Sequence, residues 1–215
     1  MSKPTLSINA FANAGFNSAP NIVLVIISMF LVLFAGQTLG LASPNQSKLL
    51  IAKKVKMKEI NPIVIVETNK GNFSLEVFQD KAPITSNNFL DLVNKGFYNG
   101  LTFHRFEPGF CIQGGDPVGN GTGNYVDPTT KQARYINLEV RPDLKHSSAG
   151  VLAMARANDP NSASCQFYIT LGPASFLDMQ YAVFGKVVNG LNVVQALRKG
   201  DVMKKVYVND EKAKH

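Results

Sequence analysis

The stretch that decides the fold reads FHRFEPGFCIQGGD and runs from residue 103 to residue 116. Two short runs rich in aromatic and apolar residues, 102–106 and 110–113, have the length and composition of strands. Two glycines then precede Asp116, whose side chain commonly fixes a turn. The stretch therefore predicts short strands joined by tight turns.

The flanking sequence continues this pattern on both sides. Residues 63–68 and 73–78 form two strand-like runs around a turn at 69–72, which predicts a β-hairpin. Helices are predicted at 83–95, where Pro83 suits a first turn, and at 191–198. The remaining strand candidates are 151–155, 167–170, 183–187 and 202–208. Many short strands, glycine-rich turns and only two helices indicate a closed or sandwiched β architecture.

Composition and charge narrow the possible functions. The chain has 215 residues, of which 45% are hydrophobic and 17% charged, so it has enough apolar material for one sizeable buried core. Its net charge of +7 is concentrated in five lysines between residues 48 and 58, whereas residues 59–208 carry 14 basic and 13 acidic side chains. A nucleic-acid groove needs clustered basic residues on the fold itself, so no nucleic-acid partner is expected.

Three further features of the sequence bear on whether it binds a phosphate or a metal or forms a disulfide. The glycine-rich run 119–123 lacks the Lys-Ser/Thr pair and the following helix of a phosphate loop, so it is interpreted as a surface loop. His104 is interpreted as a structural histidine and His146 lies in a loop, so no histidine cluster for a metal is predicted. Cys111 and Cys165 leave two alternatives open, free thiols or a disulfide near the site.

The N-terminal part of the chain does not resemble the rest. Residues 22–36 carry no charge and only Ser28 is polar, and the uncharged run continues to Ala42. It is interpreted as a signal peptide or a membrane anchor, which predicts membrane association and a membrane-associated or exported protein, in the periplasm or a lumen-like compartment. The predicted organisation is a leader or anchor at 1–42, a basic linker at 43–59, a folded domain at 60–208 and a charged tail at 209–215. Cleavage and topology stay open.

The central stretch resembles the signature of the cyclophilins, the peptidyl-prolyl cis-trans isomerases. The pattern F-H-R-x(4)-F-x-x-Q-G-G-D is highly specific, and further segments over residues 60–208 match the family as well. The short loops are closest to those of prokaryotic-type members. The resemblance implies a closed eight-stranded antiparallel β-barrel capped by two α-helices, a site on its outer surface, and a monomeric catalytic domain. It also implies catalysis without a cofactor or metal and proline-containing polypeptides as substrates.

The resemblance also assigns roles to residues. Arg105 is expected to be catalytic, because a planar, permanently charged donor aimed at the prolyl nitrogen favours the twisted amide. Gln113 is expected to orient Arg105 and to contact substrate backbone. Substrate-binding positions are Phe110, Cys111, Met154, Ala155, Arg156, Gln166, Phe167, Tyr168, Phe176, Leu177 and Tyr181.

Three positions depart from the commonest family pattern. Phe176 stands where many members carry a cyclosporin-binding tryptophan, Tyr181 stands in place of a histidine, and Cys111 replaces a frequent methionine. Weak cyclosporin binding at most is therefore expected. The alternative function is a proline-peptide-binding or chaperone module with incidental turnover.

Overall fold

The structure is a computed structural model that describes residues 61–209, and these begin with the predicted hairpin. Strand β1 (Ile63–Thr68) pairs antiparallel with β2 (Gly71–Val77) across a two-residue turn. The hydroxyl of Thr68 accepts the Lys70 N–H at 3.0 Å and donates to the Gly71 carbonyl at 2.7 Å, and Gly71 has a φ of 124°. Alternate side chains of both strands are buried, as the period of two requires. The predicted hairpin is confirmed.

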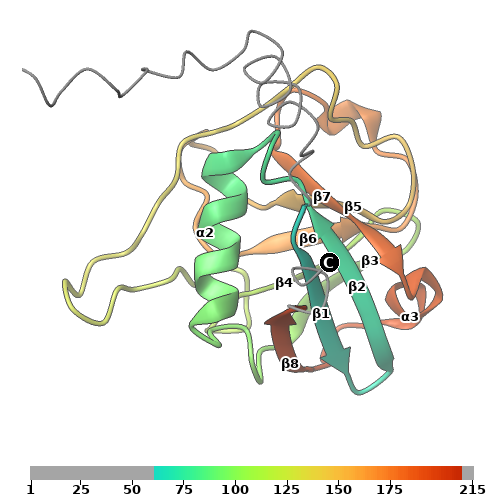
Figure 1. Cartoon of the computed structure of the whole chain (residues 1–215), viewed down its shortest axis with the longest axis horizontal. Helices are drawn as coiled ribbons and strands as arrows, with labels where there is room; N and C mark the ends of the chain where they lie inside the picture. Colours follow the sequence, from blue (N-terminus) through green and yellow to red (C-terminus); the bar gives the residue numbers. More distant parts are fainter. Residues whose placement is uncertain (1–60, 210–215) are drawn as a thin grey trace, which may run out of the picture. The chain divides into compact units, whose positions relative to one another are not determined.

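Eight strands form one antiparallel sheet in the order β3-β4-β6-β5-β7-β2-β1-β8, which curls around the core (Figure 1). The other six are β3 (Phe103–Glu107), β4 (Cys111–Gly114), β5 (Val151–Met154), β6 (Phe167–Thr170), β7 (Val183–Asn189) and β8 (Met203–Val208). Gly115 has a φ of 84°, and a Cβ there would lie 2.6 Å from the Cys165 carbonyl oxygen. The glycine therefore lets the chain leave β4 at a point where a side chain would not fit.

The prediction of a fully closed barrel is corrected. Within residues 61–209, the two ends of the sheet, β3 and β8, are not joined by a strand ladder. The Thr102–Val202 bridge and backbone hydrogen bonds such as Phe103 N–H to Asp201 O, at 2.8 Å, link the segments beside them. The fold is an eight-stranded antiparallel half-barrel, because this last pairing is irregular.

Within residues 61–209, two α-helices and one short 3₁₀ turn accompany the sheet. Helix α2 (Pro83–Asn94) has proline in its first turn, as predicted, and packs against β8. Its Phe89 is fully buried among Tyr98, Phe167 and Phe184, with ring centroids 5.2 to 5.5 Å away. Helix α3 (Leu191–Ala196) is shorter than predicted, since Leu197 is already extended. The 3₁₀ turn η1 (Ser175–Leu177) was not predicted.

The sheet is buried on both faces where the site lies. One face contributes to the inner core, and the other carries a second apolar cluster around Cys111, Ala153, Tyr168 and Leu177. Every residue of β5 and β6 is buried, which fits the continuous apolar character of these strands. Residues of this outer cluster line the site together with its polar side chains.

Several predicted segments lie outside the described residues. They are the apolar run and the leader or anchor at 1–42, the basic linker at 43–59, and the tail beyond Asn209.

Candidate active site

Arg105 stands at the head of a row of side chains that crosses three strands. The register pairs Arg105 on β3 with Gln113 on β4, and Gln113 with Tyr168 on β6. Directly opposed residues of neighbouring strands point to the same face, so the three side chains lie side by side on the outer surface. A guanidinium, an amide and an aromatic ring are therefore presented together.

The guanidinium of Arg105 is half-exposed and loosely held. Its Nη1 donates to Oε1 of Gln113 and its Nε to Oε1 of Glu107, both at 3.4 Å. It also lies 5.7 Å from the ring centroid of Phe110. These contacts fix the plane of the guanidinium without using all of its N–H groups, so donors remain for a ligand.

A pocket of about 650 Å³, here called the first pocket, opens beside Arg105. Its apolar lining comprises Phe110, Cys111, Ala155, Tyr168, Leu177 and Tyr181. Its polar lining comprises His104, Arg105, Glu107, Gln113, Asn120, Gly121 and Arg156. Apolar side chains next to charged and amide groups suit a compact apolar ring attached to a peptide backbone.

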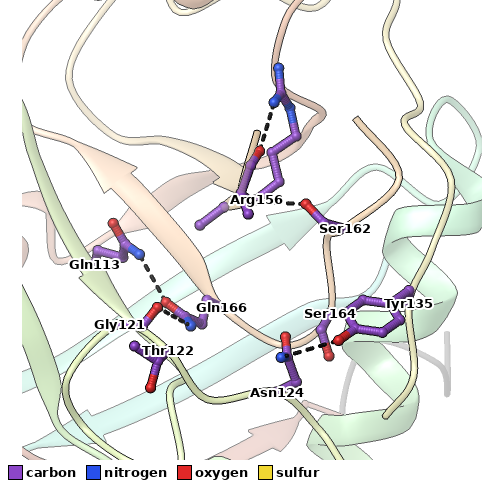
Figure 2. Close-up of a pocket in the computed structure, with 11 residues that line it drawn as sticks. Gln113, Gly121, Thr122, Asn124, Tyr135, Arg156, Ser162, Ser164 and Gln166 are labelled. Carbon is purple, nitrogen blue, oxygen red and sulfur yellow. Dashed lines mark hydrogen bonds between the residues drawn. The ribbon is translucent and has the colours of Figure 1, made fainter. Parts of the chain in front are cut away.

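A second pocket of about 380 Å³ adjoins the first one (Figure 2). The two share Gln113, Gly121, Ala155 and Arg156, so an extended ligand can reach from one to the other. The remaining lining residues are Thr122, Asn124, Tyr135, Ala157, Ser162, Ser164 and Gln166.

Hydrogen-bonded amides connect Arg105 to the glycine-rich loop. Nε2 of Gln113 donates to Oε1 of Gln166 at 3.0 Å (Figure 2). The amide nitrogen of Gln166 then donates to the carbonyls of Gly121 and Gly123, at 3.0 and 2.9 Å. Because each amide is oriented by its neighbour, the Gln113 oxygen is held ready to accept from Arg105.

Arg156 holds together two loops that border the pockets. Its guanidinium donates to the carbonyls of Gln180, Ala157 and Asn158 at 2.8 to 3.2 Å, and lies 4.5 Å from the ring centroid of Tyr181. These contacts use the fork of the guanidinium to hold two loops together, so Arg156 shapes the pocket as well as lining it.

Most of the predicted site residues come together. Nine of them line the first pocket, and Gln166 lines the second. Met154 and Phe167 do not line either pocket, because strand alternation directs them into the inner core. Phe176 is 65% exposed beside the first pocket, with its ring 5.5 Å from that of Phe110.

The two cysteines are free, which decides between the two alternatives. Cys111 on β4 is paired with Thr170 on β6, and Cys165 lies five residues before Thr170 in the chain. At about 3.3 Å per residue this separates the thiols by more than the roughly 7 Å that a disulfide tolerates between Cα atoms. Cys111 faces the outer cluster and Cys165 the inner core.

Sequence reasoning missed several residues of the site. Glu107 lies two residues from Arg105 and pairs with it, and Tyr135 enters the second pocket from a long loop. Asp178 and His146 form a pair behind the pocket. Glu107 lies within the decisive stretch and Asp178 within a segment that resembles the family. Tyr135 and His146 lie in loops whose course shows no periodicity. His104, interpreted as structural, is buried but also lines the first pocket.

Asp116 organises the loop that forms one wall of both pockets. Its carboxylate accepts the backbone N–H groups of Val118 and Asn120, at 2.8 and 2.9 Å, and that of Gly121. Burial raises the pKa of Asp116, but these hydrogen bonds together outweigh it and hold the pKa below its usual value. The buried charge therefore fixes the loop.

Asp116→Asn is expected to lower the free energy of unfolding by about 1–3 kcal/mol at neutral pH, because the carbonyl of Asn cannot serve three donors as a carboxylate does. A group whose pKa is depressed in the folded state stabilises it above the unfolded pKa, and this contribution is lost as the pH falls through the folded value. The variant should therefore lose less stability than the parent on acidification. Urea unfolding at pH 7 and at pH 3 measures both effects.

Asp159→Asn is the matched control, because the carboxylate of Asp159 accepts one backbone N–H, that of Asn161, at an exposed turn. A change of less than about 0.5 kcal/mol is expected there. Equal effects of the two substitutions would contradict the role given to Asp116.

Comparisons with known proteins place the chain in a family. A model of the family described as "Cyclophilin type peptidyl-prolyl cis-trans isomerase/CLD" matches residues 63–214. The chain belongs to the cyclophilins. It is similar to peptidyl-prolyl cis-trans isomerase-like 1 of Rhizopus delemar, with 42% identity over 134 residues that cover 62% of this chain and 78% of the relative. It is also 42% identical to peptidyl-prolyl cis-trans isomerase ppi1 of Schizosaccharomyces pombe over 134 residues, 62% of this chain and 83% of the relative.

Solved structures agree with this assignment. A cyclophilin type peptidyl-prolyl cis-trans isomerase of Cryptosporidium parvum has a TM-score of 0.62 and 32% identity, covering 69% of this chain and 98% of its own. Its structure in the presence of the dipeptide Ala-Pro has a TM-score of 0.61 and 33% identity, with coverages of 68% and 98%. This cyclophilin is therefore a peptidyl-prolyl cis-trans isomerase.

The relatives correct two predictions. The prokaryotic-type subtype is not supported, because these relatives are eukaryotic. The membrane-associated or exported localisation is wrong for the same reason, since the chain resembles isomerase-like 1 proteins of fungi. Among residues 61–209, no helix has the length and hydrophobicity needed to cross a bilayer.

Proposed function

We propose that a monomeric domain over residues 60–208 uses Arg105 to accelerate rotation about Xaa-Pro bonds in polypeptides. The partial double bond of the planar amide imposes a barrier of about 20 kcal/mol. When the amide twists, the prolyl nitrogen regains its lone pair and accepts a hydrogen bond that the planar form cannot accept. A donor at that position stabilises the transition state more than the ground state, which is the condition for catalysis.

The free N–H groups of Arg105 at the mouth of the first pocket are the observation that carries this proposal. The hydrogen bonds to Gln113 and Glu107, both 3.4 Å long, leave the guanidinium half-exposed and facing a cavity with an apolar lining. A proline ring in that cavity would bring its nitrogen to the rim where the guanidinium lies.

The apolar lining supplies the remaining acceleration. A thousandfold rate increase needs about 4 kcal/mol of preference for the transition state, whereas one charge-assisted hydrogen bond supplies roughly 1.5–3 kcal/mol. Phe110, Tyr168 and Leu177 exclude water from a bound proline and so remove hydrogen bonds that favour the polar, planar resonance form. Desolvation and Arg105 therefore act in the same direction.

The substrate is proposed to be an extended proline-containing chain. The two pockets share four lining residues, so a peptide that buries proline in the first pocket can place a neighbouring residue in the second. Gln113, Arg156 and Gln166 offer polar atoms along this path. The Cryptosporidium relative was solved in the presence of Ala-Pro, which supports this class of ligand.

A refolding reaction limited by proline isomerisation tests the proposal. The full chain should raise the slow refolding rate in proportion to its concentration, and a proline-containing peptide should compete. A module that only binds would retain the peptide and leave the rate unchanged. That result would favour the alternative function.

Phe176→Trp is expected to tighten cyclosporin binding measurably. Phe176 is exposed beside Phe110 and has no N–H to donate, whereas an indole does. Calorimetric titration of the parent and the variant compares the two affinities, and the rate of isomerisation should change less than about twofold, since Phe176 lies outside the lining of the first pocket. Tight binding by the parent would contradict the prediction.

A further inference from the structure

Three hydrogen-bonded side chains lie behind the aromatic floor of the first pocket. The imidazole of His146 is fully buried, with Nε2 2.8 Å from the Tyr168 hydroxyl and Nδ1 3.0 Å from Oδ1 of Asp178. The planes of the His146 and Tyr168 rings are inclined by only 9°, and the ring centroids lie 6.0 Å apart. The same Asp178 oxygen accepts the backbone N–H of His146 at 2.8 Å.

Asp178 and Tyr168, the outer members of this hydrogen-bonded series, decide which groups donate and which accept. The backbone N–H of His146 lowers the pKa of Asp178, burial opposes it, and the imidazole lowers it further, so the carboxylate stays ionised and only accepts. In the tautomer whose Nδ1–H donates to this carboxylate, Nε2 carries no proton and is an acceptor. Burial raises the pKa of Tyr168 far above its usual value, so the hydroxyl keeps its proton and donates to Nε2.

The hydrogen bonds among Tyr168, His146 and Asp178 join three separate parts of the pocket. Tyr168 belongs to β6, His146 lies in the loop before β5, and Asp178 directly follows η1, which carries the pocket residue Leu177. The backbone N–H of Ala174, just before η1, donates to the His146 carbonyl at 2.8 Å. The floor and the wall of the pocket are thus held against each other through His146.

We propose that His146 and Asp178 are positioning residues of the isomerase site, which set the place of the Tyr168 ring beneath a bound proline. This inference rests on the proposed function, because it takes the first pocket as the proline site. Tyr168 lines the first pocket, while its hydroxyl lies 2.8 Å from Nε2 of the buried His146. A change in that hydrogen bond therefore changes how the substrate is held, and not only how stable the fold is.

Tyr168→Phe in the full chain is the first test. It is expected to raise KM for an Xaa-Pro peptide about fivefold and to change kcat by less than about twofold, since binding weakens equally in the ground and transition states. Tyr98→Phe is the matched control, because the Tyr98 hydroxyl donates to the Cys165 carbonyl at 3.0 Å in the inner core. The control should lower the melting temperature without raising KM.

A double-mutant cycle separates positioning from general destabilisation. His146→Ala should raise KM in the parent and have no further effect on KM in the Tyr168→Phe background, because the coupling passes through one hydrogen bond. His146→Gln, whose amide oxygen can accept from Tyr168, should recover part of the parent KM. Additive effects of Tyr168→Phe and His146→Ala, or no recovery with His146→Gln, would overturn the proposal.

The outcomes also distinguish this inference from the proposed function. A parent without turnover or peptide binding would contradict both. An active parent that loses activity in Arg105→Ala, but keeps the same KM in Tyr168→Phe and His146→Ala, would leave the proposed function standing and reject the positioning role.

Discussion

Arg105→Lys is expected to lower kcat/KM at least about a hundredfold, or roughly 2.7 kcal/mol of transition-state stabilisation. Lysine keeps the charge, but it is a strongly hydrated point donor on a flexible stem and cannot reproduce the planar fork of the guanidinium. In the structure that fork gives one N–H to Gln113 and another to Glu107 while presenting the rest to the first pocket. Refolding-coupled kinetics on the purified full chain measures the loss.

Two further variants frame this result. Arg105→Ala should lose little more than Arg105→Lys, and both should still bind Xaa-Pro peptides and melt near the parent temperature, because Arg105 is exposed on the outer face. Arg141→Lys is the matched control, since Arg141 pairs with Asp143 at the surface, away from both pockets. Parent-like turnover by Arg105→Lys would reject the forked-donor mechanism in favour of a general effect of positive charge.

Phe89→Ala is expected to lower the free energy of unfolding by about 3–5 kcal/mol, the largest stability effect predicted for this chain. Phe89 is fully buried at the point where α2 meets the sheet, and its ring contacts three other aromatic rings. Truncation leaves a cavity that these rigid neighbours cannot fill. Chemical unfolding followed by circular dichroism measures the change.

Ile84→Ala on the same helix provides the comparison. Ile84 is 48% exposed, so removing its side chain should cost less than about 0.5 kcal/mol. Similar losses for the two variants would contradict the role given to the aromatic cluster, because both replacements by alanine raise the helix propensity.

Local features of the fold could be predicted from the sequence because their signals are local. The hairpin at 63–77 combines period-two alternation with a glycine turn, and α2 begins at Pro83 as its sequence indicates. Closure of the sheet could not be predicted in the same way. It depends on residues near 102 and 202, a hundred positions apart, and their pairing is a single bridge whose irregularity leaves no mark in either segment.

Some residues of the candidate site could likewise be predicted from the sequence, and others could not. Arg105, Gln113 and Tyr168 form one row because strand register places them there, and strand patterns were visible in the sequence. Met154 and Phe167 carried a family signal, yet alternation turns them to the inner core. The contact between His146 and Asp178 could not be predicted, because the two lie 32 positions apart, with β5 and β6 between them.

The placement of the two cysteines has a consequence for how this protein can be observed. Burial raises the pKa of both Cys111 and Cys165 to about 11, so the reactive thiolate is scarce at neutral pH. Both thiols are buried, but Cys111 borders the first pocket, whereas Cys165 becomes reachable only when the inner core opens. The rate at which a small alkylating reagent labels Cys165 therefore measures how often the native state opens, and this measurement needs no added probe.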